Sequence, residues 1–327
     1  MVAPPLGEFK VGWICATSVG AAVARIMLDE IFGFLDEQDS TDINQYVLGR
    51  IDKHYVVIAS VPDRNEPTSA SIVVANMLRT FSSSLRIGLI VGVGGGIPSE
   101  KSDIRLGDIV VGSPQENSSG VVQYQMKEVD ERRELAQTGS LYSTPRPLLN
   151  AITNMRTTWI TDFEEYPEYL KAATERNGRT RKRFGRPDSS DRLFKTEYQH
   201  SLTEKTCDRC LPEWEVIRDE REDTVPKIHF GVIASGNPAM KDDATRDVLQ
   251  KETDALCFET EAAGLLEGFP CIVIRGICDY CDSHKNEEWQ DYAALAAASY
   301  AKEVLKYVSQ VQISKEKLVV DIIPTQF

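Results

Sequence analysis

Two acidic positions near the carboxyl end of the chain have the residue type and spacing for chemistry on a sugar-linked base. Glu261 follows the apolar run 255–258, and Asp279 follows the apolar run 271–277. The small residues at 261–268 predict a helix between them, and therefore a strand–helix–strand unit. Ligands of open α/β sheets bind at the carboxyl ends of the strands. One carboxylate there can accept hydrogen bonds from two adjacent hydroxyls, and another can deliver a proton.

Alternating strand-like and helix-like segments must position these carboxylates. Short apolar runs predict strands, and apolar residues at helical spacing predict helices. Strands are expected at 11–16, 86–93, 108–112 and 228–234, a hairpin at 46–61, and helices at 21–30, 69–81, 147–159 and 291–308. This alternation is typical of an α/β fold, here a three-layer sandwich with a central mixed β-sheet. The tail 318–327 is β-prone.

Residues 161–225 differ in character from the segments on either side. They are polar and highly charged, and they are poor in aliphatic clusters. Buried strands are expected before and after them, so the segment interrupts the α/β pattern without ending it. We therefore expect a single domain over 1–327, with a charged, polar insertion at 161–225.

Composition narrows the class of protein. The chain has 327 residues and a net charge of −13, which argues against a general nucleic-acid binder. No apolar stretch is long enough to span a bilayer, and the first five residues lack a signal-peptide pattern. We therefore expect a cytoplasmic protein with no nucleic-acid and no membrane partner. Four of the seven cysteines lie in strand-like runs and are expected to be buried free thiols: Cys15, Cys257, Cys271 and Cys278.

Several motifs resemble those of the nucleoside phosphorylase superfamily. Glu-Thr-Glu-Ala-Ala at 259–263 and Arg-Gly-Ile-Cys-Asp at 275–279 are similar to its paired motifs. Residues 92–96 and 105–111 match its glycine turn and the following strand, and Ser-Gly-Asn at 235–237 resembles its turn beside the base. The superfamily contains purine nucleoside and uridine phosphorylases and methylthioadenosine/adenosylhomocysteine nucleosidases. The likeness is greatest to the phosphorylase-like domains of fungal proteins, some fused to signalling modules.

The resemblance implies roles for both carboxylates. Glu261 would bind the ribose hydroxyls and stabilise an oxocarbenium-like transition state. Asp279 would be the general acid that protonates the leaving purine, although an acid at this position also suits a helix N-cap or a turn. Thr260 replaces the methionine that the family has before Glu261, and Cys278 replaces its serine before Asp279. The substrate-binding residues implied are Phe258, Glu259, Thr260, Gly94, Gly95, Asn237 and Cys278.

The choice between hydrolysis and phosphorolysis depends on two positions. Phosphorylases of the family bind phosphate with an arginine just ahead of the glycine turn, but strand 89–94 has none. Nucleosidases carry a water-activating glutamate where this chain has Gly20, and Asp29, Glu30 and Glu66 are acids elsewhere. We therefore predict hydrolysis of the N-glycosidic bond of a purine nucleoside or nucleotide, releasing free base. The alternatives are phosphorolysis and a nucleotide-sensing module with little turnover.

Two further features allow more than one interpretation. The basic cluster 176–186, and within it Arg181 and Arg183, suits either a clamp for the phosphates of a nucleotide or a solvated loop. The glycines at 94–96 suit either close approach to a ligand or a tight turn. Gln123 and Tyr124, which follow the strand expected at 108–112, are expected to approach the base of the substrate.

Cys207 and Cys210 have a two-residue gap suited to zinc, with His200 upstream. They supply three ligands where a structural site has four, so a local disulfide and free thiols stay open as alternatives. His284 is expected in a surface loop.

No organic cofactor is needed for the predicted reaction, and the resemblance implies a homo-oligomer, either a dimer or a trimer.

Overall fold

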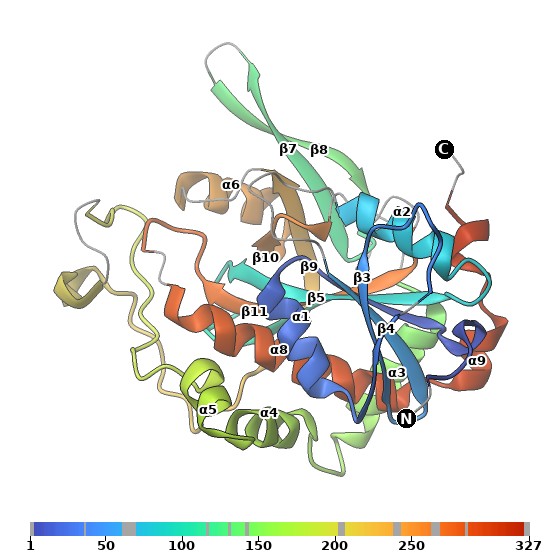
Figure 1. Cartoon of the computed structure of the whole chain (residues 1–327). Coiled ribbons are helices and arrows are strands. Elements are labelled where there is room, and N and C mark those ends of the chain that lie inside the picture. The colour runs from blue at the N-terminus through green and yellow to red at the C-terminus, as the bar shows by residue number, and fades with distance from the viewer. Residues whose placement is uncertain are drawn as a thin grey trace.

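The structure is a computed structural model that describes residues 3–35, 37–60, 70–115, 118–129, 132–140, 144–201, 207–237, 243–262, 269–284 and 287–323. Figure 1 shows a central twisted sheet with helices packed against it. Among these described residues no helix is both long and apolar enough to cross a membrane.

One large mixed sheet forms the centre of the molecule. Its strands are β1 (Val11–Cys15), β2 (Glu30–Phe34), β3 (Gln45–Ile51), β4 (His54–Ser60), β5 (Ile87–Gly96), β6 (Ile109–Gly112), β7 (Val121–Val129), β8 (Arg132–Ser140), β9 (Ile228–Asn237), β10 (Ala255–Glu259) and β11 (Cys271–Asp279). The order is β2-β3-β4-β1-β5-β11-β6-β9-β7-β8, and β10 pairs with β5 and β9. β1, β5 and β11 are parallel neighbours, whereas β6 is antiparallel to β11. The prediction of a mixed α/β fold is therefore confirmed.

Helices pack against both faces of this sheet. They are α1 (Ser18–Met27), α2 (Ala70–Thr80), α3 (Arg146–Thr158), α4 (Tyr166–Glu175), α5 (Gly178–Phe184), α6 (Asp243–Thr253), α8 (Gln290–Tyr307) and α9 (Gln310–Lys315). Because side chains alternate along a strand, Trp13 of β1 faces a core shared with α1, α3, α4 and α8. Its neighbour Ile14 faces a second core shared with α2.

Some elements differ from the expectation. The glycines at 94–96 are not a turn, because β5 continues through Gly96. α1 begins at Ser18, where the Thr17 hydroxyl accepts the Gly20 N–H, and Glu30 begins strand β2 instead of ending a helix. The tail forms a short 3₁₀ turn at Val319–Asp321 in place of a strand. The helix expected at 261–268 lies largely outside the described residues.

Segment 161–225 packs against α8 through two helices that its polar composition did not predict. Glu303 of α8 accepts hydrogen bonds from the indole N–H of Trp159 (2.9 Å) and from the Tyr166 N–H (2.7 Å). Leu170 and Phe184 join the core beneath α4 and α5. Between α5 and β9 the described residues are mostly irregular, with 3₁₀ turns at Cys207–Arg209 and Pro212–Trp214.

Candidate functional site

Asp279 lies at the carboxyl end of the central strand β11, opposite Gly95 of β5. Its Oδ1 accepts the Cys281 N–H at 3.0 Å, and the Cys278 thiol donates to Oδ2 at 3.6 Å. Cys281 has a positive φ of 55°, so the chain turns sharply just past the acid. A Cβ on Gly95 would overlap the Asp279 carboxylate and the Cys281 sulfur, and only glycine leaves that room.

A cleft of about 720 Å³ opens beside Asp279, and basic side chains line its wall. Its lining includes five cationic residues, Arg181, Lys182, Arg183, Arg186 and Arg192, and four acidic ones, Asp188, Asp208, Asp279 and Glu288. Arg183 pairs with Asp291 at 2.8 Å, and Arg186 stacks over Trp289 with 5.0 Å to the ring centroid. The basic cluster is thus a helix and the turn after it, not an irregular loop, and it places positive charge on the same cleft as Asp279.

Glu261 lies beyond the end of β10 and pairs with Arg275 of β11, with 3.0 Å from Nη1 to Oε2. Arg275 is completely buried, and its Nη2 pairs with Glu259 at 2.5 Å. The Glu259 carboxylate also accepts the N–H groups of Glu261 and Ala262. Burial raises the pKa of Glu261; the charge of Arg275 opposes that rise, and nearby Glu259 adds to it.

Arg275 changes the conclusion drawn from the missing arginine of strand 89–94, because it places a cation beside Gly92. The two residues are paired in register, and a Cβ on Gly92 would overlap Nη1 of the guanidinium. The arginine that β5 itself lacks is therefore supplied by the neighbouring strand. Both of its terminal nitrogens pair with carboxylates, so a phosphate dianion at this position would meet Glu259 and Glu261 as well. No local signal in the sequence indicates this pairing, because Gly92 and Arg275 are distant in sequence and meet only through the register of β5 and β11.

Glu261 also lines a small cavity together with Thr17, Gly20 and Gly92. Its volume is about 10 Å³, room for about one water molecule. The other acids considered for water activation lie elsewhere. Asp29 pairs with Lys302 at 2.5 Å, Glu30 pairs with Arg50 at 3.0 Å, and Glu66 lies outside the described residues.

The two carboxylates face different cavities, Asp279 the large cleft and Glu261 the small one. Both lie against β5, at Gly95 and at Gly92. Three residues along a strand span about 10 Å, which is comparable to the length of a nucleoside. The two acids therefore lie against the same strand, β5, and among the cavities formed by the described residues they line different ones.

The other predicted binding residues lie in different surroundings. Phe258 pairs in register with Gly95, and its buried ring lies 5.1 Å from that of Tyr124, while Thr260 is exposed. The Tyr124 hydroxyl is buried without a hydrogen-bond partner among the described residues. Gly94 lies against the Phe258 carbonyl and the Arg275 side chain. Asn237 ends β9, but its side chain is outside the described part.

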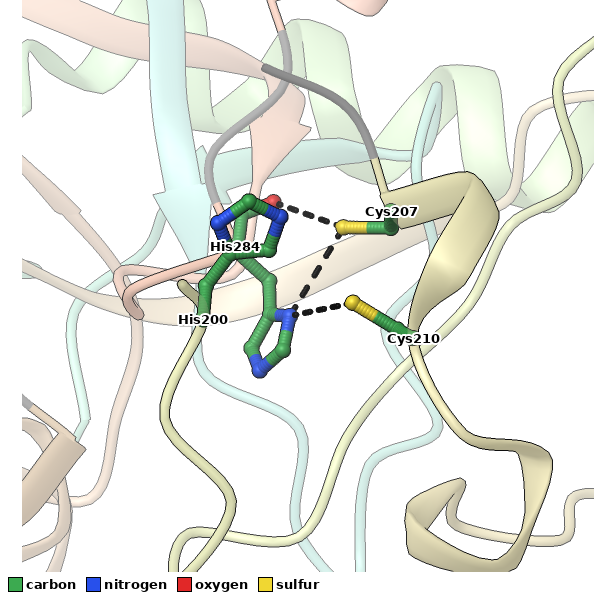
Figure 2. A group of neighbouring side chains, drawn as sticks. All are labelled: His200, Cys207, Cys210 and His284. Carbon is green, nitrogen blue, oxygen red and sulfur yellow. Dashed lines mark hydrogen bonds between the residues drawn. The ribbon is translucent and has the colours of Figure 1, made fainter. Parts of the chain in front are cut away.

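A second cluster lies at the cleft's edge. Figure 2 shows His200, Cys207, Cys210 and His284 with their side chains directed toward one another. His284, which was expected in a surface loop, is buried and is the fourth member that the sequence analysis did not identify. Spacing could not indicate it, because it lies 74 residues beyond Cys210. The seven cysteines are all free thiols, as expected for the buried ones.

Comparisons with known sequences give one strong match. A scan against profiles of known protein families finds no match. A nucleotide-binding leucine-rich repeat (NLR)-like protein of Hyaloscypha variabilis is 40% identical over 312 residues. The match covers 95% of this chain and 30% of the relative, so the chain spans less than a third of the relative's length.

Solved structures match over nearly the whole chain at low identity. Futalosine hydrolase of Helicobacter pylori is 14% identical, with a TM-score of 0.55, over 91% of this chain and 98% of its own. A putative 5′-methylthioadenosine/S-adenosylhomocysteine nucleosidase of Borrelia burgdorferi bound to adenine is 15% identical, with a TM-score of 0.56, over 90% and 99%. The same nucleosidase of Neisseria meningitidis, in complex with methylthio-immucillin-A, is 15% identical, with a TM-score of 0.54, over 91% and 99%.

These matches establish the fold. The chain has the fold of the nucleoside phosphorylase and nucleosidase superfamily, and the resemblance indicated by its motifs is confirmed at that level. The NLR-like relative agrees with the likeness to fungal phosphorylase-like domains.

Proposed function

We propose that this chain hydrolyses the N-glycosidic bond of a purine nucleoside or nucleotide and releases the free base. The observation that carries the proposal is Asp279, which lies at the end of β11, against Gly95, in a cleft with a basic wall. In this mechanism protonated Asp279 gives its proton to the purine, and the electrons of the breaking C–N bond go to the base. Glu261 stabilises the cationic sugar and accepts hydrogen bonds from its hydroxyls. Water then forms a C–O bond to the anomeric carbon and loses a proton to solvent, from which Asp279 regains the proton that it gave to the base.

Arg275 favours hydrolysis over phosphorolysis. A phosphorylase needs a cation free to bind the attacking phosphate. Here the buried guanidinium already pairs with Glu259 and Glu261, whose charges would repel a phosphate dianion. A neutral water meets no such repulsion, and the small cavity between Glu261 and Gly20 has room for about one.

The basic wall of the cleft favours a phosphorylated substrate, with Arg181 and Arg183 as the phosphate ligands. Arg183 is already paired with Asp291, so Arg181 is the better position for a test. Arg181→Glu replaces an attractive charge with a repulsive one on the cleft. We expect KM for ATP or AMP to rise about ten-fold or more while KM for adenosine stays within about two-fold.

Arg179→Glu is the matched control for that substitution. It makes the same charge change on the same helix, but Arg179 is not among the residues that line the cleft. Initial rates against substrate concentration give both KM values. Equal effects of the two variants, or an unchanged KM for the nucleotide in Arg181→Glu, would eliminate the phosphate clamp.

A nucleotide-sensing module with little turnover is the second candidate. The position that carries the water-activating glutamate in nucleosidases is Gly20 here, on the cavity beside Glu261. The relative from Hyaloscypha variabilis is named as NLR-like, and this chain matches only 30% of it. A domain that serves a larger receptor needs to bind its ligand but does not need rapid turnover.

The proposed reaction is tested by chromatography of base release from adenosine, inosine, methylthioadenosine, adenosylhomocysteine, AMP and ATP, each with and without phosphate. We expect release that is independent of phosphate and is lost by about 10²-fold or more in Asp279→Asn, which cannot donate the proton. Asp162→Asn, an exposed substitution between α3 and α4, is the control and should retain the wild-type rate. Undiminished release by Asp279→Asn would refute the assignment of the acid, and release that requires phosphate would show a phosphorylase.

We also propose a layered architecture, an oligomeric state and a location for this chain. The helices on the two faces of the sheet support a three-layer sandwich, with 161–225 as an insertion packed on α8. A homo-oligomeric state, as a dimer or trimer, and a cytoplasmic location stay predictions.

A further inference from the structure

We propose that His200, Cys207, Cys210 and His284 bind a structural zinc ion that joins residues 198–200 and 207–210 to the loop after β11. Each residue offers one ligand atom, and the four ligand atoms lie within 4.8 Å of one another. Figure 2 shows that the cysteines come from one turn and that His284 comes from a separate part of the chain. The site is distinct from the carboxylates proposed to act on the substrate.

The separations between ligand atoms suit tetrahedral zinc. Zn–S bonds of about 2.3 Å and Zn–N bonds of about 2.0 Å at tetrahedral angles place sulfur and nitrogen about 3.5 Å apart. Nδ1 of His284 lies 3.6 Å from the Cys207 sulfur and 3.7 Å from the Cys210 sulfur. One ion between these three atoms would therefore need little movement of the chain.

The surroundings of His284 fix the ring as a metal ligand. Nε2 lies 2.8 Å from the Tyr198 carbonyl oxygen, which can only accept a hydrogen bond, so Nε2 carries the hydrogen. Nδ1 is then unprotonated, and its lone pair faces the two sulfurs. The ring stacks on Phe194, with centroids 4.1 Å apart and planes 19° apart, and lies beside Tyr198. A hydrogen bond from the non-ligating nitrogen to a carbonyl is the usual outer-shell partner of a metal-bound histidine.

The other ligands are also held by their surroundings. The Cys210 N–H donates to the Cys207 carbonyl at 3.0 Å, which closes the turn that brings both sulfurs to one side. The Arg192 guanidinium donates to the carbonyl oxygens of both cysteines. The His200 N–H donates to the Ser283 hydroxyl at 3.0 Å, so the segment with His200 is fastened next to His284.

Two sulfur and two imidazole donors in a tetrahedral arrangement select zinc among the common metals. Binding displaces the two thiol protons, and two thiolates neutralise Zn²⁺, which suits a partly buried site. Four protein ligands leave no open coordination position for a substrate, so the role is structural. His284 lies five residues after Asp279, and both line the cleft, so the ion would fix the cleft wall next to the proposed acid.

The first test is the metal content of the full chain. Protein purified without added metal and dialysed against metal-free buffer should contain about one zinc ion per chain by elemental analysis. After exchange with Co²⁺, the protein should show the intense visible d–d bands of tetrahedral cobalt and a thiolate-to-cobalt charge-transfer band. Both measurements are independent of any enzymatic activity.

Ligand variants test the assignment. Cys210→Ser and His284→Ala should lower the zinc content about ten-fold or more and abolish the cobalt bands, with a melting temperature lowered by several degrees. Cys278→Ser is the matched thiol-to-hydroxyl control outside the cluster, and Arg209→Gln is the control between the two cysteines. Both controls should keep the wild-type zinc content.

Three results would overturn the proposal. The first is wild-type protein that holds no zinc and gives no tetrahedral cobalt spectrum even after reduction and addition of the metal. The second is a Cys207–Cys210 disulfide in protein kept under reducing conditions, measured by intact mass with thiol labelling. The third is full zinc content in the ligand variants, which would place the metal elsewhere. Because the first two use the wild type, they hold even if a variant fails to fold.

Discussion

In the proposed hydrolysis, Gly20 is the position expected to limit activation of the attacking water. It lies in the first turn of α1, on the small cavity that Glu261 and Gly92 also line. A Cβ added there would meet its nearest atoms, on Cys15 and Thr17, at 3.4 Å, which is ordinary contact. The backbone at this position therefore has room for a Cβ, and Gly20→Glu is expected to direct a carboxylate toward the small cavity. If the natural protein is a weakened hydrolase, base release should rise about ten-fold or more.

Gly20→Gln separates the effect of charge from that of size. Glutamine has the length of glutamate, but its amide cannot take a proton from the attacking water as a carboxylate can. An equal rise in both variants would refute general-base activation at this position. A wild type that is already fast and slows in Gly20→Glu would instead eliminate the sensor hypothesis. Rates of base release at saturating substrate provide the comparison.

Residues whose position in the fold depends on their own neighbours in sequence could be placed before the structure was known. Glu261 and Asp279 each follow an apolar strand, and that local pattern points to the carboxyl edge of the sheet. Arg275 and His284 could not be assigned in this way. Their partners, Gly92 and Cys207, come from distant parts of the chain, and only the sheet register and the packing of residues 198–200 and 207–210 bring them together.

At the scale of elements, the apolar segments were predicted within a few residues. β1, the β3–β4 hairpin, α3 and α8 all lie where the strand-like and helix-like patterns placed them. The β7–β8 hairpin, which projects from the body in Figure 1, was not predicted as a pair. α4 and α5 were also missed, because few of their residues are apolar and much of their stabilisation comes from packing on α8.

The glycines of β5 show how one element can mislead a sequence analysis. A run of three glycines is typical of a turn, yet here it continues a central strand. Each glycine makes room for a different neighbour: the Phe258 carbonyl at Gly94, the Asp279 carboxylate at Gly95, and the Ile277 side chain at Gly96. Tertiary contacts thus leave no room for a side chain at any of these three positions, and such contacts cannot be inferred from the sequence alone.

At the scale of the whole molecule, Asp108 fastens the end of segment 161–225 to the sheet. Only 1% of Asp108 is exposed, and its two oxygens accept hydrogen bonds from Arg221 at 2.7 Å. His229 lies 2.9 Å from Oδ2, and the Lys227 N–H donates to Oδ1. Burial disfavours the charge, but the hydrogen bonds from Arg221 and His229 outweigh it and hold the pKa of Asp108 below its ordinary value.

Asp108→Asn should therefore lower the free energy of unfolding by about 3 kcal/mol at neutral pH, because it leaves Arg221 without its buried partner. Asp103→Asn is the control: Asp103 also contacts arginines but is half exposed, so its loss should cost less than about 1 kcal/mol. Since the pKa of Asp108 is lower in the folded than in the unfolded state, its contribution is complete at pH values well above the unfolded pKa of about 4 and disappears as the pH falls through the folded value. Urea denaturation at pH 7, 5, 4 and 3 should show wild type and Asp108→Asn converging at the acid end. A gap that stays constant with pH, or one no larger than that of Asp103→Asn, would mean that the ionised carboxylate does not hold this segment in place.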